Sequence, residues 1–278
     1  MDRESDITKQ WRRTAPFWEK YQDVIRTMFL PVSEALIQDA EIVQGNSVLD
    51  VATGPGEPAL TVAKRVGPKG RVTGVDPAPE MIEAAKRAAV RQNVGNAQFE
   101  VAFGDRLSFP ADDFDAAVSR FGVMFFPSPV DGLREILRVL KPRRKLAMAV
   151  WHFLERNPFH TVLSRVVEKY VPSEPPEPDA PDAFRFATPG KLRRILDEAG
   201  AAESAERLLQ FNIEAPVSLD EFWTLRSEMS DNLRTKLAGL SESQFDDVRS
   251  EVIAGLRQYS TNRGLSFPAE VLIISGRK

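Results

Sequence analysis

The sequence predicts a doubly wound α/β fold, in which helices cover both faces of a mainly parallel sheet. Between residues 46 and 152, short apolar strands alternate with amphipathic helices. A glycine-rich turn follows the first strand, and Asp50 and Asp76 stand at the ends of the first two strands. Such alternation is typical of parallel sheets, and residues at the strand ends lie where these sheets bind ligands.

Residues 5–44 precede this alternation and are expected to be helical. Apolar residues from Ile7 to Phe29 recur at spacings of three and four or their sums. Pro16 and Pro31 are expected to break the stretch into two or three helices, because proline removes a helical hydrogen bond.

The alternating region supplies five strands with helices between them. The expected strands are residues 47–51, 71–75, 98–102, 114–119 and 145–151. The expected helices are residues 59–66, 79–90 and 130–140. After Trp151 we expect helices at 158–170 and 189–199, a sixth strand at 203–214, helical segments over 218–259 and a last strand at 269–275.

This order of elements divides the chain into six segments. The proline-rich acidic run over 172–182 is expected to be a loop. The segments are an N-terminal helical lid (1–45), the α/β core (46–152), a cap insertion with the proline-rich loop (153–184), a core helix and strand (185–215), a second helical cap insertion (216–262) and the last core strand (263–278).

The composition limits the class of protein. Lys and Arg total 37 against 40 Asp and Glu, whereas proteins that bind nucleic acid usually have a basic excess. The chain has no cysteine, which excludes disulfides and thiolate zinc sites and suits a reducing cytosol. No apolar run is long enough to cross a bilayer. We therefore expect a cytoplasmic protein with no nucleic-acid partner and no integral membrane association.

The strongest functional signal is the turn between the first strand and the first core helix. Gly54 and Gly56 allow the backbone to approach a ligand closely, and the helix after them offers free N–H groups. Asp76 follows Gly56 by twenty residues and ends the next strand. An acid in this place can accept hydrogen bonds from both ribose hydroxyls of an adenosine.

Taken alone, the glycine pattern also fits the fingerprint of an NAD-dependent oxidoreductase. Asp50 favours a different ligand, because its carboxylate would repel a pyrophosphate and attract the ammonium of a methionine moiety. Pro58 removes an N–H at the helix start, where a pyrophosphate would need donors. A turn without a ligand is the remaining interpretation.

These residues and later motifs resemble the class I S-adenosylmethionine-dependent methyltransferases, and more narrowly the ubiquinone/menaquinone-biosynthesis-like subgroup (methyltransferase type 11/25). The motifs are Val-Leu-Asp50-Val-Ala-Thr-Gly54-Pro-Gly56, Gly-Val-Asp76-Pro, Met81, Gly104-Asp105, Ser119-Arg-Phe-Gly-Val-Met-Phe-Phe126 and Leu-Lys-Pro142. The resemblance covers about residues 45–152. It implies a Rossmann-like, seven-stranded mixed sheet with an antiparallel last strand and a helical cap. Arg143-Arg144 departs from the family, which usually has Gly-Gly there.

The resemblance also implies a binding site for S-adenosylmethionine. Its expected residues are Asp50, Thr53, Gly54 and Gly56 for the methionine end, Asp76 for the ribose, Pro77, Met81, Gly104, Asp105, Arg106 and Leu107 around the adenine, and Ser119 and Arg120 along the floor. From the residues alone, Asp105 fits a plain turn equally well, and a helical Met81 is more often part of a core.

Two histidines are the candidate general bases. His152 follows the fifth strand and His160 lies on the next helix, so each could take a proton from an acceptor near pH 7 or be a hydrogen-bonded wall residue. The expected substrate contacts are Trp18, Tyr21, Phe125 and Trp151. For the two aromatic residues of the N-terminal helices, plain packing is the better interpretation.

The predicted reaction is SN2 transfer of a methyl group from S-adenosylmethionine to an oxygen, nitrogen or carbon atom of a small, largely apolar molecule. Because sulfonium is a strong electrophile, positioning can supply much of the rate, and no metal is implied. The alternatives are the oxidoreductase and a protein that binds S-adenosylmethionine without chemistry. A nucleic-acid methyltransferase is disfavoured, because Ser119-Arg-Phe-Gly is not a base-flipping motif. The apolar segments outside the core would enclose a pocket or form a homodimer interface.

Overall fold

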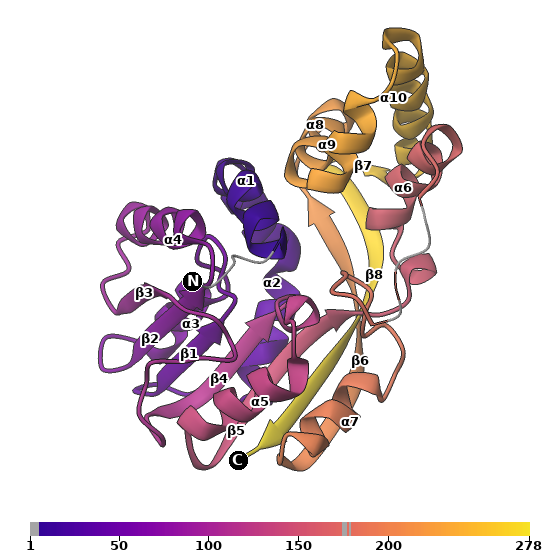
Figure 1. The fold of residues 1–278 in the computed structure, drawn as a ribbon. Coiled ribbons are helices and arrows are strands. Elements are labelled where there is room, and N and C mark those ends of the chain that lie inside the picture. The colour runs from indigo at the N-terminus through magenta and orange to yellow at the C-terminus, as the bar shows by residue number, and fades with distance from the viewer. Residues whose placement is uncertain (1–5, 174–176, 178) are drawn as a thin grey trace.

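The computed structural model describes residues 6–173, 177 and 179–278, and these form one eight-stranded sheet with helices around it (Figure 1). The strand order is β3-β2-β1-β4-β5-β8-β6, and β7 pairs with β8. The strands are β1 (Ser47–Val51), β2 (Arg71–Asp76), β3 (Ala97–Val101), β4 (Phe114–Arg120), β5 (Leu140–Trp151), β6 (Ala202–Ala215), β7 (Ser260–Thr261) and β8 (Gly264–Arg277).

The sheet is mixed, as the sequence predicts. Strands β1 to β5 run parallel to their neighbours among themselves, and β8 runs antiparallel to both β5 and β6. The extra strand is the two-residue β7, which is too short to leave a periodic signal. The chain adds β2 and β3 on one side of β1, then β4 and β5 on the other. The order therefore reverses between β1 and β4, the point at which open α/β sheets bind ligands.

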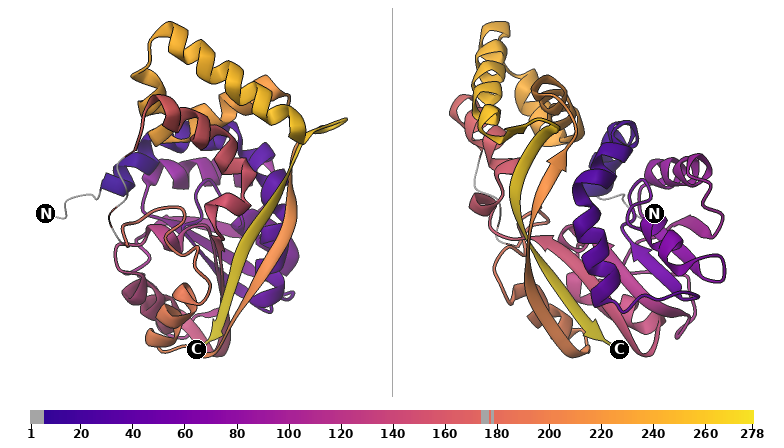
Figure 2. Two further views of the ribbon diagram at one scale, coloured as in Figure 1. Left: turned by 90° about the vertical axis from the view of Figure 1, so that its right-hand side faces the viewer. Right: turned by 180° about the vertical axis from the view of Figure 1, so that it is seen from behind.

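Helices cover both faces of this sheet. Helices α5 (Pro129–Val139) and α7 (Lys191–Glu198) lie on one face, and α2 (Gln22–Asp39) and α3 (Ala59–Val66) lie on the other (Figures 1 and 2). Helix α4 (Pro79–Arg91) packs beside β2 and β3. Buried apolar residues of β1, β4 and β5 fill the core between these layers.

The N-terminal helices correct one expectation. Pro16 lies inside α1 (Asp6–Lys20) and Pro31 lies inside α2, so neither proline breaks its helix. The two helices instead meet at Tyr21. Because one face of α2 is buried along its length, we infer that tertiary packing outweighs the hydrogen bond that Pro31 removes.

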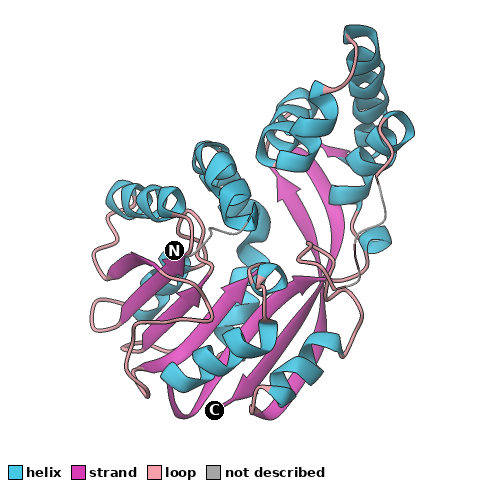
Figure 3. Cartoon of the chain, in the orientation of Figure 1, coloured by secondary structure: helices cyan, strands magenta, loops and turns pink. Residues whose placement is uncertain are grey.

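A helical lobe stands over the carboxyl ends of the parallel strands. It contains α6 (Pro158–Tyr170), α8 (Leu219–Met229), α9 (Asp231–Ala238) and α10 (Glu242–Leu256). Strands β6 and β8 extend beyond the sheet as a two-stranded ribbon that carries this lobe (Figures 1 and 3). Helix α1 lies between the lobe and the core and contacts both α8 and α4.

Side-chain caps fix where α8, α9 and α10 begin. Ser218 and Ser241 each form a capping box, with Glu221 and Gln244 as the reciprocal partners. Ser230 caps α9. These short helices are therefore separated by defined turns, which suits a rigid wall better than a continuous helix.

The division of the chain into six segments stays a prediction. In the described part of the chain, no helix has both the length and the apolar character needed to cross a membrane.

Candidate functional site

A cavity of about 590 Å³ lies where the strand order reverses, between the α/β core and the helical lobe. Its walls come from α1, α2, the turns after β1, β2, β3 and β4, and residues of α6, α8 and α9. This volume falls in the range of small-molecule and cofactor sites. The cavity is therefore the candidate functional site.

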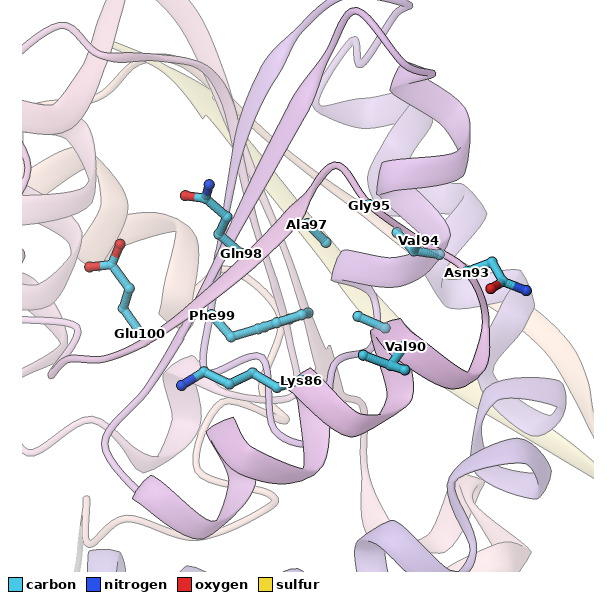
Figure 4. A pocket seen from close by; sticks show the side chains of 10 residues that line it. Lys86, Val90, Asn93, Val94, Gly95, Ala97, Gln98, Phe99 and Glu100 are labelled. Atoms are coloured by element: carbon cyan, nitrogen blue, oxygen red, sulfur yellow. The ribbon is translucent and has the colours of Figure 1, made fainter.

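A second hollow lies at the free edge of the sheet, between β3 and α4 (Figure 4). Its lining is mostly apolar or small, and the charged residues there are Lys86 and Glu100. Val90 beside it is 78% exposed, so this hollow is open to solvent. It lacks the converging polar groups of a functional site. Nowhere in the described residues do three or more acids or histidines gather closely enough to hold a metal ion.

Asp50 lies directly beneath the turn after β1 and is fully buried. Its Oδ2 accepts hydrogen bonds from Thr53 Oγ1 at 2.6 Å and from the backbone N of Ala59 at 3.0 Å. Its Oδ1 has no partner among the described residues. Burial raises the pKa of Asp50 to about 7. The side chain thus fixes the turn and the start of α3, and its charge acts on the cavity from below.

Asp76 ends β2 and faces the cavity. Its Oδ2 accepts a hydrogen bond from the backbone N of Gly54 at 3.0 Å, and its Oδ1 accepts one from the backbone N of Ala78 at 2.9 Å. Burial raises the pKa of Asp76 to about 6. A carboxylate has about four acceptor positions, so each oxygen can still accept a hydrogen bond from a ligand.

The turns after β1 and β4 approach each other closely. Ala52 and Phe121, which follow these strands, both have left-handed backbone angles, with φ of 61° and 60°. A Cβ on Gly122 would lie 2.4 Å from the Cβ of Ala52, so only glycine fits there. Strained non-glycine residues of this kind cluster at functional sites.

Arg120 continues the floor of the cavity from the end of β4. Its Nη1 donates a hydrogen bond to Ser33 Oγ at 2.9 Å, and its Nη2 donates one to the backbone O of Glu57 at 3.3 Å. Burial lowers the pKa of Arg120, while the charges of Glu57 and Asp50 oppose that change. Oε1 of Glu57 is buried without a partner among the described residues. The floor thus offers both a cation and unused acceptors to a zwitterionic ligand.

Four aromatic rings form a wall on the side toward the lobe, from Phe29, Phe121, Trp151 and Phe159. The rings of Phe121 and Trp151 stack, with centroids 4.5 Å apart and planes 3° from parallel. Phe29 meets the rings of Phe121, Trp151 and Phe159 edge-on. We call these four residues the aromatic wall. Its flat apolar surfaces suit a flat apolar ligand.

His160 and Arg226 stand next to the aromatic wall. Nη2 of Arg226 lies 3.4 Å from Nδ1 of His160, and the guanidinium carbon lies 4.2 Å from the centre of the Phe159 ring. Burial, together with the charge of Arg226, lowers the pKa of His160 well below its usual value. His160 is therefore neutral at pH 7.

The cavity brings together many of the residues expected from the sequence. Those that line it are Trp18, Thr53, Gly54, Asp76, Pro77, Met81, Gly104, Asp105, Arg120, Phe125, Trp151 and His160. The expected residues that do not line it are Tyr21, Asp50, Gly56, Arg106, Leu107, Ser119 and His152.

Local contacts explain why several of the expected site residues do not line the cavity. The hydroxyl of Tyr21 donates a hydrogen bond to Glu228 at 2.6 Å. Nδ1 of His152 lies 2.8 Å from Oε2 of Glu270, so its ring is engaged away from the cavity. Ser119 is buried in the sheet. Of the two candidate bases, only His160 reaches the cavity.

Sequence reasoning did not single out Phe29, Glu57, Phe121, Phe159 or Arg226. Glu57 directly follows the glycine turn, and Phe121 lies within the motif Ser119-Arg-Phe-Gly. Their places in these motifs could have marked them as site residues. Phe29 and Phe159 have the spacing of ordinary core residues. Nothing in the sequence distinguishes Arg226 from a surface arginine.

Comparison with known proteins identifies the core. A family model described as a methyltransferase domain matches residues 48–143. Aklanonic acid methyltransferase DauC of Streptomyces sp. (strain C5) is 33% identical over 119 residues, which cover 43% of this chain and 54% of that protein. A demethylmenaquinone methyltransferase of Listeria monocytogenes is 27% identical over 146 residues, which cover 52% of this chain and 62% of that protein. The chain thus spans little more than half the length of these relatives.

The fold extends further than these sequence matches. The crystal structure of the YcgJ protein from Bacillus subtilis matches with a TM-score of 0.55 and 20% identity, covering 88% of this chain and 97% of that one. This likeness shows the fold alone. The comparisons support the predicted methyltransferase core over residues 48–143, and they give no support to the oxidoreductase alternative.

Proposed function

We propose that this chain, whose residues 48–143 are a methyltransferase domain, transfers the methyl group of S-adenosylmethionine to a small, largely apolar molecule. One observation carries the proposal: a single cavity joins the acid-bearing turns of the methyltransferase domain to an aromatic wall under the helical lobe. A cofactor and an acceptor can therefore meet inside the same enclosure.

The turns after β1, β2, β3 and β4 form the cofactor half of the cavity. Asp76 accepts the hydrogen bonds of the ribose hydroxyls, and Met81 and Pro77 pack against the adenine, with Asp105 at its rim. The negative field of Asp50 favours the ammonium of the methionine moiety, and Arg120 favours its carboxylate. These assignments give an opposite charge to both the ammonium and the carboxylate of the methionine moiety.

The acceptor half is the part bounded by the aromatic wall, α1 and the lobe. Trp151 belongs to the aromatic wall; Trp18 and Phe125 also line the cavity, and their contact with the substrate stays a prediction from the sequence. S-adenosylmethionine supplies a methyl group on a positively charged sulfur, which is already electrophilic. The chain contributes by excluding water and by holding the acceptor in line with the methyl group, which can account for much of a rate enhancement.

Further features favour a small acceptor over a macromolecule. The lobe and α1 stand over the carboxyl edge of the sheet, where an open face would admit a nucleic acid. The net charge of −3 gives no general attraction for a polyanion. A cytoplasmic location and a possible homodimer stay predictions from the sequence.

A crystal structure with bound S-adenosylhomocysteine tests the proposal. We expect the ribose to lie against Asp76 and the sulfur to face the part of the cavity bounded by the aromatic wall. A ligand whose sulfur faced bulk solvent, or whose adenosine lay away from Asp76, would contradict the assignment of the two halves.

A further inference from the structure

We infer that Arg226, which donates a hydrogen bond to His160, forms a binding site for a carboxylate on the methyl acceptor. This inference rests on the proposed function, because it places the carboxylate in the acceptor half of the cavity. It assigns Arg226 to substrate recognition and His160 to holding Arg226, and it narrows the acceptor to a flat, apolar molecule that carries an anionic oxygen group.

Arg226 is a cation without an anion. It lines the cavity, and among the residues that the structure describes no carboxylate oxygen forms an ion pair with it. Its Nε is buried and has no hydrogen-bond partner there, and Nη1 forms no hydrogen bond with a described residue. Buried cations are normally paired, because leaving water is costly for a charge. A ligand that brings an anion would supply the missing partner.

Arg226 stays positively charged although its side chain is buried. Burial lowers the pKa of Arg226 to about 10, so the guanidinium remains protonated at pH 7. The ring of Phe159, 4.2 Å from the guanidinium carbon, offers a favourable face to the cation and orients its plane. The cation can therefore be held in place while its hydrogen-bond donors stay available.

His160 helps to hold the guanidinium in place, because its Nδ1 accepts a hydrogen bond from Arg226. A guanidinium has only N–H donors, so Nδ1 of His160, which faces Arg226, must be the unprotonated ring nitrogen. Because the ring is neutral at pH 7, its one proton lies on Nε2. Nε2 is buried and has no partner among the described residues. His160 thus positions Arg226, in contrast to the general base that the sequence suggested.

A site made only of donors fits an anionic oxygen. The free nitrogens of Arg226 offer N–H groups and no acceptor, and carboxylate oxygens are acceptors only. Of the acids that also line the cavity, Asp231 is paired with Arg13 at 2.7 Å and Arg234 at 2.6 Å. Asp182 accepts a hydrogen bond from the backbone N of Phe184 at 2.7 Å. Neither of these acids forms an ion pair with Arg226.

The aromatic rings around His160 indicate that the rest of the ligand is apolar. Trp151 and Phe159 lie edge-on to His160, with centroid distances of 4.5 and 5.1 Å, and Phe184 lies edge-on at 5.2 Å. The donors are therefore set into an apolar surface. An aromatic carboxylate would place its ring on the aromatic wall and its anionic group on the donors.

The test compares naphthoate with naphthamide, which share a shape but differ in charge. Binding of each probe is measured calorimetrically to protein saturated with S-adenosylhomocysteine. We expect naphthoate to bind at least about tenfold more tightly than naphthamide. Arg226→Met should weaken naphthoate binding by about 10–100-fold and leave naphthamide binding unchanged, because charge-assisted hydrogen bonds are lost. Arg249→Met, which removes an exposed arginine paired with Asp220, is the matched control and should change neither.

Thermal unfolding separates recognition from a structural role. Because no acid among the described residues pairs with Arg226, Arg226→Met should leave the unfolding midpoint of the unliganded protein unchanged or raise it. A lower midpoint would mean that the guanidinium stabilises the fold, and would overturn the inference. Equal affinity for the two probes, or no binding of naphthoate, would also overturn it. Failure to bind S-adenosylhomocysteine would instead contradict the proposed function.

Discussion

Asp76→Ala should weaken the binding of S-adenosylhomocysteine by about 2–3 kcal/mol, or roughly 30–150-fold, because two charge-assisted hydrogen bonds to the ribose are lost. The carboxylate that the substitution removes is buried and has a raised pKa, so its loss should not unfold the protein. Calorimetry measures the affinity, and circular dichroism confirms that the variant is folded.

Asp113→Ala provides the matched control for this substitution. Asp113 is a partly exposed acid paired with Arg71 and does not line the cavity. Its removal should leave the affinity for S-adenosylhomocysteine within about twofold of the wild type, since surface ion pairs contribute little and this one is far from the ligand. An unchanged affinity in folded Asp76→Ala would show that Asp76 does not hold the ribose.

Asp50→Asn should stabilise the unliganded protein while weakening cofactor binding. An amide keeps an oxygen for Thr53 and for the backbone N of Ala59 but removes the buried charge. At pH 8 the free energy of unfolding should rise by about 1–4 kcal/mol, with the upper limit set by a pKa change of about three units. The affinity for S-adenosylhomocysteine should fall about tenfold, because the ammonium loses an opposing charge.

The direction of the pH dependence follows from the raised pKa. Asp50 titrates at about 7 in the folded protein, against 3.8 in its ordinary state. Between these pH values the folded state binds more protons than the unfolded state, so the stability of the wild type falls as pH rises from about 4 to about 7. Asp50→Asn should lack this part of the decline. Identical stability profiles for the two proteins would contradict a costly buried charge at this position.

The sequence predicted the core well because its signals are local. The strand ends at Asp50 and Asp76, and the glycine turn between β1 and α3, depend on residues within short segments. The prolines of the N-terminal helices were misjudged, because burial of one face of α2 is a tertiary effect that local propensity does not contain. The strand β7 escaped prediction because two residues carry no period.

The acceptor half of the cavity was less accessible to sequence reasoning. His160 and Arg226 are 66 residues apart, and a histidine and an arginine on two amphipathic helices have no spacing that links them. Only the fold shows that Arg226 lies beside the ring of Phe159 and pairs with no acid in the part of the chain that the structure describes. Likewise, the sequence offers His152 and His160 equally as general bases. The structure distinguishes them, because the ring of His152 contacts Glu270.

Calorimetric titration of the unliganded protein with S-adenosylhomocysteine and, separately, with NAD tests the central claim most directly. The two ligands share an adenosine but differ at the point where the structure is most specific: Asp50 lies beneath the turn that would otherwise hold a pyrophosphate. We predict saturable binding of S-adenosylhomocysteine and no measurable binding of NAD. Tighter binding of NAD than of S-adenosylhomocysteine would contradict the account.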